Sequence, residues 1–458
     1  AVLYTSGSTG EPKGVITLQS SYINRFNWMW RLYPFSNAEV CCYKTSIGFV
    51  DSIWEIFGSL LRGVKLVIIP KHKVQDTNLF LAELSKYNIS RITVVPTLLE
   101  TLLNEVEIGA FPDTIEIVTV SGDALSSKLV ERFLNLASAK KLLNLYGSTE
   151  VGADGTYFLI GQGHHYHSSK GGIIGKPIDN MKGYVLNKDM VPLPIGAVGE
   201  LYIGGVGLAR GYLNRPDLTQ ERFIANPFQT AEEKRLGKNG RLYKTGDLVR
   251  WLPDGNLEYI GRNDFQVKIR GHRVELGEVE EVLSAYDGIK QSVVVVRDHL
   301  DIREDESSKY LVGYYITEDD IDWQEKEILT YLQSRLPDYM MPTRLVWLKE
   351  FPLTINGKLD RKKLPEPDFT IGDNYVAPST DLEKQICKIW SEVLGLPENT
   401  VGIHDDFFRL GGNSILAIKV ASGMSKSIAI IGVAAIFKYR NIEQLSVFLY
   451  EMISSNIE

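Results

Sequence analysis

Residues 4–14 read Tyr4-Thr5-Ser6-Gly7-Ser8-Thr9-Gly10-Glu11-Pro12-Lys13-Gly14 and follow an apolar run typical of a strand. The stretch combines hydroxyl groups, glycines and one lysine. Small residues let backbone N–H groups approach phosphate oxygens, and the lysine adds a positive charge. Because the Gly-Lys-Ser/Thr ending of the common P-loop is missing, the stretch predicts a different kind of phosphate loop. A polar surface turn is the alternative.

The chain around this loop has an alternating α/β texture up to about residue 220. Short β-branched runs such as 65–70 and 116–120 alternate with helical patterns such as 98–106 and 128–138. This order predicts parallel strands covered by helices. From about 196 to 262, short apolar pieces separated by glycines predict antiparallel hairpins instead.

The second half of the chain changes texture twice more. Residues 265–364 mix helical and strand patterns, which predicts a smaller α+β lobe. A proline-containing stretch without periodicity then indicates a semi-rigid linker. Residues 379–458 carry apolar residues at helical spacing and predict an all-helical domain.

Composition excludes several classes of function. A chain of 458 residues should hold two or three domains. The net charge of −7 is spread without a basic block, so we expect neither a nucleic-acid nor a membrane partner. Three cysteines without metal-ligand spacing, and the lack of a signal peptide or long apolar run, indicate a cytoplasmic protein. Residue 1 is an alanine inside an apolar run, so we expect the true N-terminus to lie upstream.

Further motifs in a fixed order resemble the adenylate-forming superfamily of acyl-CoA synthetases, luciferases and peptide-synthetase adenylation domains. The loop at 4–14 resembles its phosphate loop, and residues 144–150 (NLYGSTE) resemble its adenine and magnesium motif. The resemblance implies that Tyr146 packs on adenine and that Thr149 and Glu150 act at the reacting phosphate, with Glu150 holding Mg²⁺. Ser148 replaces the proline usual in the family.

The resemblance also assigns residues to ATP and to movement between lobes. Asp247, in the motif 243–247, would accept hydrogen bonds from the ribose hydroxyls, and an aspartate that caps its own turn is the alternative. Arg262 would touch ribose or phosphate, and Asp264 would be the hinge. Residues 266–273 resemble the loop used for thioester formation. The expected ATP-binding residues are Thr5, Ser6, Gly7, Ser8, Thr9, Gly10, Lys13, Asn144, Tyr146, Gly147, Ser148, Asp247 and Arg262.

Two further motifs lie in the second half of the chain. Lys358, in PLTINGK, resembles the family's C-terminal lysine, whose charge suits stabilisation of phosphate attack. A solvated surface lysine is the alternative. Ser414, in LGGNSI, resembles the attachment site of 4′-phosphopantetheine in a peptidyl or acyl carrier domain, and it also suits a helix N-cap. The resemblance therefore implies ATP, Mg²⁺ and phosphopantetheine as cofactors.

Residues 48–55 resemble the start of the amino-acid specificity pocket. Most α-amino-acid-activating relatives have an aspartate after the phenylalanine, whereas this chain has Val50 there and Asp51 one residue later. The full predicted pocket is Val50, Asp51, Trp54, Thr93, Thr119, Ser121, Leu145, Ala153 and Asp154, with Lys358 at the carboxylate end. This string resembles β-alanine-activating domains. A β-ammonium lies one carbon farther from the carboxylate, so its countercharge must move, and Asp51 and Asp154 could supply it. Ordinary solvated positions for both acids are the alternative.

The motifs together predict an adenylation enzyme fused to its own carrier. We expect a large lobe at 1–264 that is incomplete at its N-terminus, a small lobe at 265–368 and a four-helix carrier at 376–458. An amino acid, with β-alanine favoured, would react with ATP to give aminoacyl-AMP and then pass to the thiol on Ser414, aided by rotation about Asp264. Expected partners are a phosphopantetheinyl transferase and downstream synthetase domains. An acyl-CoA synthetase using free CoA and an inactive fragment serving only as a carrier are the alternatives.

Overall fold

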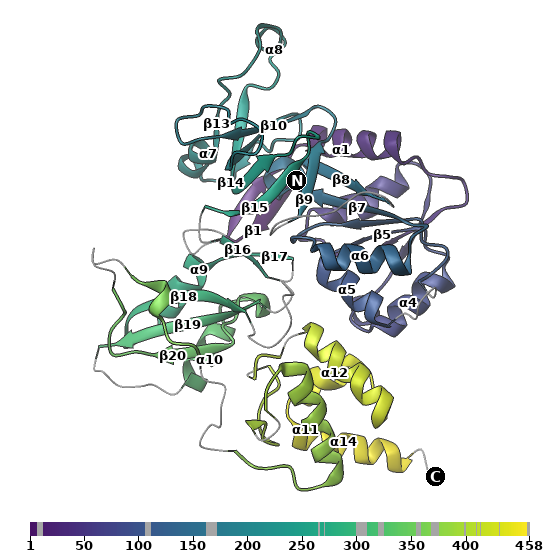
Figure 1. Ribbon diagram of the computed structural model, residues 1–458, viewed down its shortest axis with the longest axis vertical. Coiled ribbons are helices and arrows are strands. Elements are labelled where there is room, and N and C mark those ends of the chain that lie inside the picture. The colour runs from purple at the N-terminus through teal and green to yellow at the C-terminus, as the bar shows by residue number, and fades with distance from the viewer. Residues whose placement is uncertain are drawn as a thin grey trace. The chain divides into compact units, whose positions relative to one another are not determined.

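A computed structural model gives the fold (Figure 1). It describes residues 1–6, 12–105, 111–161, 172–263, 266–269, 271–298, 309–318, 325–353, 359–367, 375–397, 400–408, 410–412, 414–429 and 431–455. The contacts divide the chain into two compact units, whose main boundary falls between Arg273 and Val274.

A parallel sheet forms one half of the first unit, as the alternating texture predicted. Its strands are β3 (Val40–Tyr43), β4 (Lys65–Ile68), β5 (Arg91–Val94), β6 (Ile117–Val120) and β7 (Lys141–Tyr146), in the order β4-β3-β5-β6-β7. The accompanying helices are α1 (Gln19–Leu32), α2 (Asp51–Ile53) with the π-helical turn η1 (Trp54–Gly58), α3 (Lys71–Val74), α4 (Thr77–Lys86), α5 (Pro96–Glu105) and α6 (Ser127–Leu136).

Every residue of the central strands β5 and β6 is buried, as expected for parallel strands that are covered on both faces. On β6, Val118 and Val120 join the cluster that contains Phe80 of α4, Leu102 of α5 and other residues of α6. Ile117, one residue away, faces the opposite cluster with residues of α1 and η1. The side chains of a strand alternate between faces, so one strand serves both cores.

Antiparallel strands extend the same sheet, as the glycine-punctuated segment predicted. Among the described residues the sheet has twelve strands, in the order β10-β11-β14-β15-β9-β8-β7-β6-β5-β3-β4, with β13 paired to β14. The added strands are β8 (Thr156–Ile160), β9 (Ile173–Pro177), β10 (Met181–Leu186), β11 (Gly199–Gly205), β13 (Phe223–Ala225), β14 (Arg241–Trp251) and β15 (Leu257–Arg262).

Smaller elements complete the first unit. A separate antiparallel sheet carries the predicted phosphate loop between its first two strands: β1 (Val2–Thr5), β2 (Lys13–Ile16) and β12 (Gly211–Tyr212). The rest are the 3₁₀ turn η2 (Thr149–Val151), α7 (Pro216–Arg222), α8 (Ala231–Arg235) and β16 (Gln266–Ile269). The strand β17 (His272–Glu275) pairs with β16 and runs across the boundary between Arg273 and Val274.

The second unit begins with a small α+β lobe. Its sheet pairs β18 (Ile289–Asp298) antiparallel to β19 (Lys309–Thr317), and β19 parallel to β20 (Arg344–Trp347). Its helices are α9 (Leu276–Ser284), α10 (Glu325–Gln333) and the 3₁₀ turns η4 (Asp338–Met340) and η5 (Arg361–Lys363). This mixture agrees with the α+β texture of the sequence.

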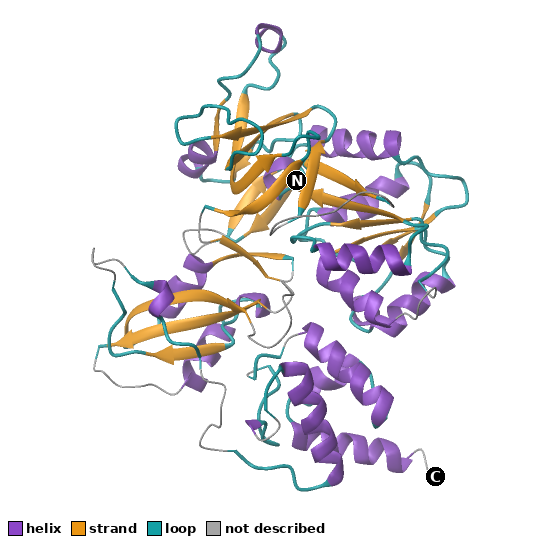
Figure 2. Ribbon diagram, viewed as in Figure 1, coloured by secondary structure: helices purple, strands orange, loops and turns teal. Residues whose placement is uncertain are grey.

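A helical bundle follows the small lobe (Figure 2). Its helices are α11 (Asp381–Leu394), α12 (Ser414–Ser427), α13 (Val433–Lys438) and α14 (Ile442–Ser455). Thr380 and Glu383 form a reciprocal capping box at the start of α11, and Gly395 ends the helix in the left-handed conformation with φ 68°. The buried side chains of Trp390 and Phe407 meet edge to face at 4.9 Å in the bundle core.

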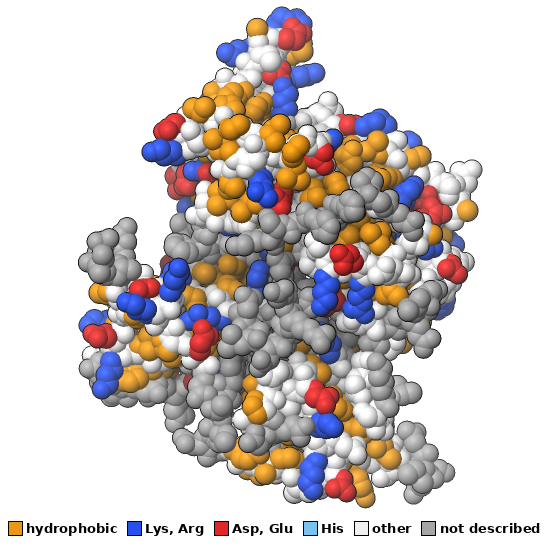
Figure 3. All heavy atoms as spheres, viewed as in Figure 1, with side chains coloured by type: hydrophobic (Ala, Val, Ile, Leu, Met, Phe, Trp, Pro, Cys, Tyr) orange, Lys and Arg blue, Asp and Glu red, His pale blue; other side chains and the backbone are white. Residues whose placement is uncertain are grey.

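The surface agrees with the scattered charge of the sequence. Figure 3 shows basic and acidic side chains interspersed over the described residues of the face in view. Within the described part of the chain, none of the helices is long and apolar enough to cross a membrane.

Candidate functional site

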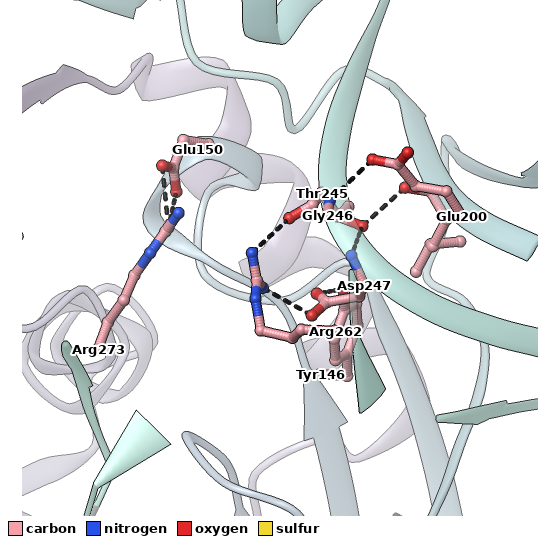
Figure 4. A network of polar contacts seen from close by, with 9 residues as sticks. Tyr146, Glu150, Glu200, Thr245, Gly246, Asp247, Arg262 and Arg273 are labelled. Carbon is pink, nitrogen blue, oxygen red and sulfur yellow. Dashed lines mark hydrogen bonds and ion pairs between the residues drawn. The ribbon is translucent and has the colours of Figure 1, made fainter. Parts of the chain in front are cut away.

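One group of polar side chains lies where the last residues of β7 and β15 meet the middle of β14 (Figure 4). The hydroxyl of Tyr146 donates to Oδ2 of Asp247, and Nη1 of Arg262 donates to Oδ1 at 2.7 Å. Asp247 and Arg262 face each other across the β14–β15 pair, so strand register sets this contact. Burial and the Asp247 carboxylate raise the pKa of Tyr146 well above its usual value, so the hydroxyl remains a donor. The sequence predicted all three residues for ATP.

The backbone around Asp247 is held by its own neighbours. Its N–H donates to Oγ1 of Thr245 at 3.0 Å, and the N–H of Gly246 donates to Oε1 of Glu200 at 3.1 Å. Arg262 also donates to the carbonyl of Thr245 at 3.1 Å. These contacts preorganise a carboxylate and a guanidinium, one acceptor and one donor, for a polar ligand.

Glu150 forms a second polar group on the turn η2. Its side chain is fully buried, and both of its carboxylate oxygens lie 3.0 Å from Nη1 of Arg273 (Figure 4). The hydroxyl of Tyr212 donates to it at 2.9 Å. Burial alone would raise the pKa of Glu150, but the positive charges of Arg273 and Lys13 outweigh it and lower the pKa to about 2. Glu150 is therefore an ionised carboxylate at neutral pH.

The described part of the predicted phosphate loop adjoins Glu150. Lys13 is buried with its Nζ 5.5 Å from the centre of the Tyr212 ring, and Ser6 donates to the carbonyl of Arg273 at 2.7 Å. Thr5 pairs with Lys13 in the β1–β2 register. Gly7, Ser8, Thr9 and Gly10 lie outside the described residues.

Two buried hydroxyls in this region indicate a ligand that the structure does not contain. Oγ1 of Thr5 and Oγ of Ser148 are both buried without a hydrogen-bond partner among the described residues. Buried hydroxyls are normally satisfied, so each is a donor available to phosphate oxygens. Thr5 also pairs with Lys13 in the β1–β2 register, so its hydroxyl and that positive charge together fit an ATP phosphate.

Two residues of the motif 144–150, Asn144 and Gly147, interact with the backbone of neighbouring segments. The side-chain amide of Asn144 is buried and donates to the carbonyl of Ile173 at 2.8 Å. At Gly147 an added Cβ would stand 1.9 Å from the carbonyl oxygen of Ala153, so only glycine fits there. Both residues shape the motif, and their predicted contact with ATP stays a prediction.

Most of the predicted amino-acid pocket is brought together in the first unit. Ser121 donates to Oδ2 of Asp51 at 3.0 Å, and Thr119 donates to Oγ1 of Thr93 at 2.8 Å. Asp51 begins the helical segment that continues into the π-helical turn with Trp54, and π turns are often found at functional sites. Strand ends thus place side chains far apart in sequence against one helix.

Other pocket positions form its apolar surroundings. Leu145 is buried on β7, and Val50 packs against the same apolar cluster, which also contains Trp54. Ala153 has φ 88°, which is uncommon for a residue other than glycine and marks a strained backbone next to the cluster.

Burial, the neighbouring charge of Asp154 and, more weakly, Glu55 raise the pKa of Asp51 to about 6, against the charge of Arg25 and the Ser121 hydrogen bond. Asp154 differs, because its Oδ2 lies 2.7 Å from Nε of Arg25 and both side chains are only 2% exposed. Sequence reasoning missed Arg25. Its only signal in the sequence is a charged residue among the apolar residues of the segment that forms α1.

A small cavity adjoins the pocket behind the Trp54 ring. It is lined by Trp54, Thr93, Thr119 and, deeper in the lobe, Met29, Phe35, Cys41, Cys42, Glu55, Ser59, Arg91, Ile92 and Ile117. Three predicted pocket residues therefore line this cavity.

The remaining predicted residues lie in the second half of the chain or at its junction. Lys358 and Asp264 are outside the described residues. The backbone of Ser414 begins α12. Its predicted position at the start of a helix is confirmed, and its attachment role stays a prediction.

Comparisons with known proteins agree with this arrangement. Residues 1–213 match the AMP-binding enzyme model, 278–358 its C-terminal domain and 384–449 the phosphopantetheine attachment site. The chain is 41% identical to gramicidin S synthase 2 of Brevibacillus brevis over 93% of its length. It is 39% identical to tyrocidine synthase 3 of Brevibacillus parabrevis, also over 93%. It spans only 9% and 6% of these relatives.

Solved structures show the same domain order. Holo-PA1221, an NRPS protein containing adenylation and PCP domains bound to a vinylsulfonamide inhibitor, matches with a TM-score of 0.77 at 25% identity. The match covers 98% of this chain and 72% of that one. Holo-AB3403, a four-domain nonribosomal peptide synthetase bound to AMP and glycine, matches with a TM-score of 0.51 at 34% identity, covering 98% of this chain and 32% of that one.

The fold and the matched domains define an AMP-binding enzyme joined to a phosphopantetheine-dependent carrier. More particularly, the chain resembles the nonribosomal peptide synthetases, matching an adenylation domain and the carrier domain that follows it.

Proposed function

We propose that this chain activates β-alanine with ATP as β-alanyl-AMP, with release of pyrophosphate, within a nonribosomal peptide synthetase or related pathway. The thiol of its own carrier domain would then take the β-alanyl group as a thioester, with release of AMP. The domain matches support the reaction class. The choice of β-alanine depends on Asp51, a largely buried carboxylate at the pocket. This acid lies one residue after Val50, whereas most relatives that activate α-amino acids have an aspartate at the position of Val50.

The nucleotide residues follow from the polar groups. Asp247 would accept from ribose hydroxyls while Arg262 donates, and the ring of Tyr146 would pack on adenine. Thr5 and Ser148 would satisfy their buried hydroxyls on phosphate, beside Lys13. A preorganised set of donors at the phosphates stabilises the charge that develops when a carboxylate attacks the α-phosphate.

Mg²⁺ would fit at Glu150, because a hard divalent cation prefers ionised carboxylate oxygen. When bound, the ion would offset phosphate charge. In this structure Arg273 contacts both carboxylate oxygens, so Glu150 can reach a metal only if the guanidinium releases at least one of them. Thr149 adjoins Glu150 on the same turn.

The pocket chemistry favours a substrate that carries an ammonium group. Asp51 accepts from Ser121 and would form an ion pair with the substrate ammonium, which a plain fatty acid lacks. Pairing would discriminate strongly, because leaving a buried charge unpaired costs several kcal/mol.

The second unit supplies the acceptor half of the proposal. Ser414 would carry 4′-phosphopantetheine, which supplies the thiol that accepts the activated acyl group. A phosphopantetheinyl transferase would load it, and downstream synthetase domains would use the product. Lys358 would stabilise the phosphate and carboxylate during activation, and Asp264 would be the hinge between half-reactions.

ATP–pyrophosphate exchange on the full-length protein tests the activation step. We expect strong exchange with β-alanine and weak exchange with α-alanine, aspartate and propionate. Asp51→Ala should remove the response to β-alanine but leave the weak propionate signal unchanged, because propionate needs no ammonium partner. A preference for α-alanine would contradict the β-alanine assignment and leave the enzyme class intact.

A second measurement separates the remaining functions. Transferase-dependent mass gain on the carrier should occur in the wild type and disappear in Ser414→Ala, which should retain normal exchange. Loading without any exchange would support a carrier-only protein. Efficient transfer to free CoA in Ser414→Ala would support an acyl-CoA synthetase.

A further inference from the structure

Arg25 is the most deeply buried cation beside the proposed pocket among the described residues. It lies on α1, and its Nε contacts Asp154 at 2.7 Å. Its guanidinium carbon lies 4.2 Å from the centre of the Trp54 ring and 6.0 Å from that of Trp28. One side chain thus contacts both an acid and an aromatic wall of the pocket.

The charges around the pocket can be summed from these contacts. Asp51 and Asp154 contribute two negative charges when ionised, and Arg25 contributes one positive charge. Glu55, the other acid acting on Asp51, is itself paired with Lys44 at 3.3 Å and accepts from the N–H groups of Lys44 and Thr45. The pocket therefore presents one uncompensated carboxylate.

The position of Arg25 also decides which of the two acids, Asp51 or Asp154, remains uncompensated. Asp154 is tied to the guanidinium, whereas Asp51 accepts a hydrogen bond from the neutral hydroxyl of Ser121. A guanidinium stacked on an indole is held in one orientation, so Trp54 and Asp154 position it from two directions. A substrate ammonium would meet Asp51 first.

We propose that Arg25 is a specificity-determining positioning residue, which reserves Asp154 and braces Trp54 so that the pocket accepts a substrate with one ammonium group. This inference rests on the proposed amino-acid activation. The inference extends the proposed activation by predicting that the net charge of the pocket selects monoamino over diamino acids. Removing either member of the Arg25–Asp154 pair should change that charge in opposite directions.

Two single variants test the charge balance. Arg25→Met leaves two acids together, so the ratio of exchange with 2,3-diaminopropionate to that with β-alanine should rise at least about tenfold. Asp154→Asn leaves Arg25 without its partner and the pocket without net charge, so the ratio of exchange with aspartate to that with β-alanine should rise by a similar factor. The double variant Arg25→Met with Asp154→Asn should restore both ratios to within about threefold of wild type.

The pH profile distinguishes positioning from a packing role. In Arg25→Met the KM for β-alanine should rise at pH 7 and recover at higher pH, because Asp51 beside an uncompensated Asp154 ionises later. Arg25→Lys keeps the charge and should keep wild-type ratios. The KM for ATP should stay unchanged in all variants, since none of these residues contacts the nucleotide group described above.

Two results would overturn the inference. One is a proportional loss with every amino acid, without a change of ratio and without rescue in the double variant, which would show that Arg25 only supports the fold. The other, which applies even if Arg25→Met does not fold, is an unchanged aspartate ratio in Asp154→Asn. If wild type prefers another monoamino acid, the proposed substrate fails, but the opposite shifts measured against that acid still test Arg25.

Discussion

Nη1 of Arg273 lies 3.0 Å from both carboxylate oxygens of Glu150, which is the acid proposed to hold a metal ion. Arg273 is 18% exposed, whereas Glu150 is fully buried. The arginine thus provides, from a more exposed position, the positive charge that a buried carboxylate needs. It and Mg²⁺ would use the same oxygens, so they should compete.

Arg273→Met should destabilise the first unit at neutral pH. Tyr212 and Lys13 still act on Glu150, so we expect a loss of about 2–3 kcal/mol in the free energy of unfolding. The pKa of Glu150 is lowered from 4.5 to about 2, so its stabilisation is present above pH 4.5 and is lost as pH falls towards 2. The deficit should therefore shrink between those values.

Urea unfolding at several pH values measures this deficit. Arg273→Lys keeps the positive charge but not the contact with both oxygens, and it is the matched control. Its free energy of unfolding should fall between those of wild type and Arg273→Met. Mg²⁺ with a non-hydrolysable ATP analogue should raise the melting temperature of Arg273→Met more than that of wild type. An equal rise in both proteins would show that Arg273 and the metal do not compete.

Tyr146→Phe separates the ring of Tyr146 from its hydroxyl. The ring that would pack on adenine remains, but Asp247 loses one donor and keeps Arg262. We expect the KM for ATP to rise about five- to tenfold, corresponding to one lost hydrogen bond to a charged group, with kcat nearly unchanged. Pyrophosphate exchange at varied ATP gives both constants. Tyr259→Phe, on the neighbouring ring at 6.5 Å, should leave the KM for ATP unchanged, and an equal effect in both variants would count against the role of Asp247.

Sequence patterns predicted the fold here because the apolar periodicities are local and unambiguous. The parallel strands β4, β5 and β6, the hairpins around β14 and the helical character of the bundle follow from them. Motif order also placed Tyr146, Asp247 and Arg262 in one group, and strand register brings them together.

The same sequence patterns could not predict which charged side chains form ion pairs. Arg25 and Asp154 are far apart in sequence, as are Glu150 and Arg273, and no local rule selects one arginine among the many. Consequently Asp154 was expected to be available to an ammonium, whereas the structure shows it already paired with Arg25. Only tertiary packing decides which buried acids have a partner.

Asp51→Asn should lose activity and gain stability. The pKa of Asp51 is raised from 3.8 to about 6, so the folded protein holds a proton that the unfolded chain has released between these values. Ionisation of Asp51 therefore lowers stability as pH rises through that window, and a neutral asparagine avoids the cost. Allowing for partial exposure of the side chain, we expect a gain of about 1–2 kcal/mol at pH 7 and little gain at pH 4.

Thermal and urea unfolding of Asp51→Asn at both pH values measures this gain, and Asp123→Asn, a nearby acid outside the pocket, serves as control. Destabilisation of Asp51→Asn at pH 7 would mean that Asp51 supports the fold rather than a substrate. The wild-type KM for β-alanine should also fall as pH rises through about 6, since only the ionised carboxylate pairs with an ammonium.

We expect Trp54 to limit the depth of the proposed pocket. Its ring lies 5.6 Å from that of Phe26 and 6.3 Å from that of Phe35, and the small cavity behind it is lined by Thr93 and Thr119. Trp54→Leu would join this space to the pocket and remove the ring that stacks on Arg25. A longer ω-amino acid would then extend into the cavity space while its ammonium still pairs with Asp51.

We therefore expect Trp54→Leu to raise the ratio of exchange with 4-aminobutyrate to that with β-alanine by about tenfold or more. The free energy of unfolding should fall by about 2–4 kcal/mol, because a large buried ring is lost. Trp28→Phe, which also trims an indole near Arg25 but does not line the cavity, should lower stability without altering the ratio. A similar change of ratio in both variants would show that chain length is read through Arg25 and not through the space behind Trp54.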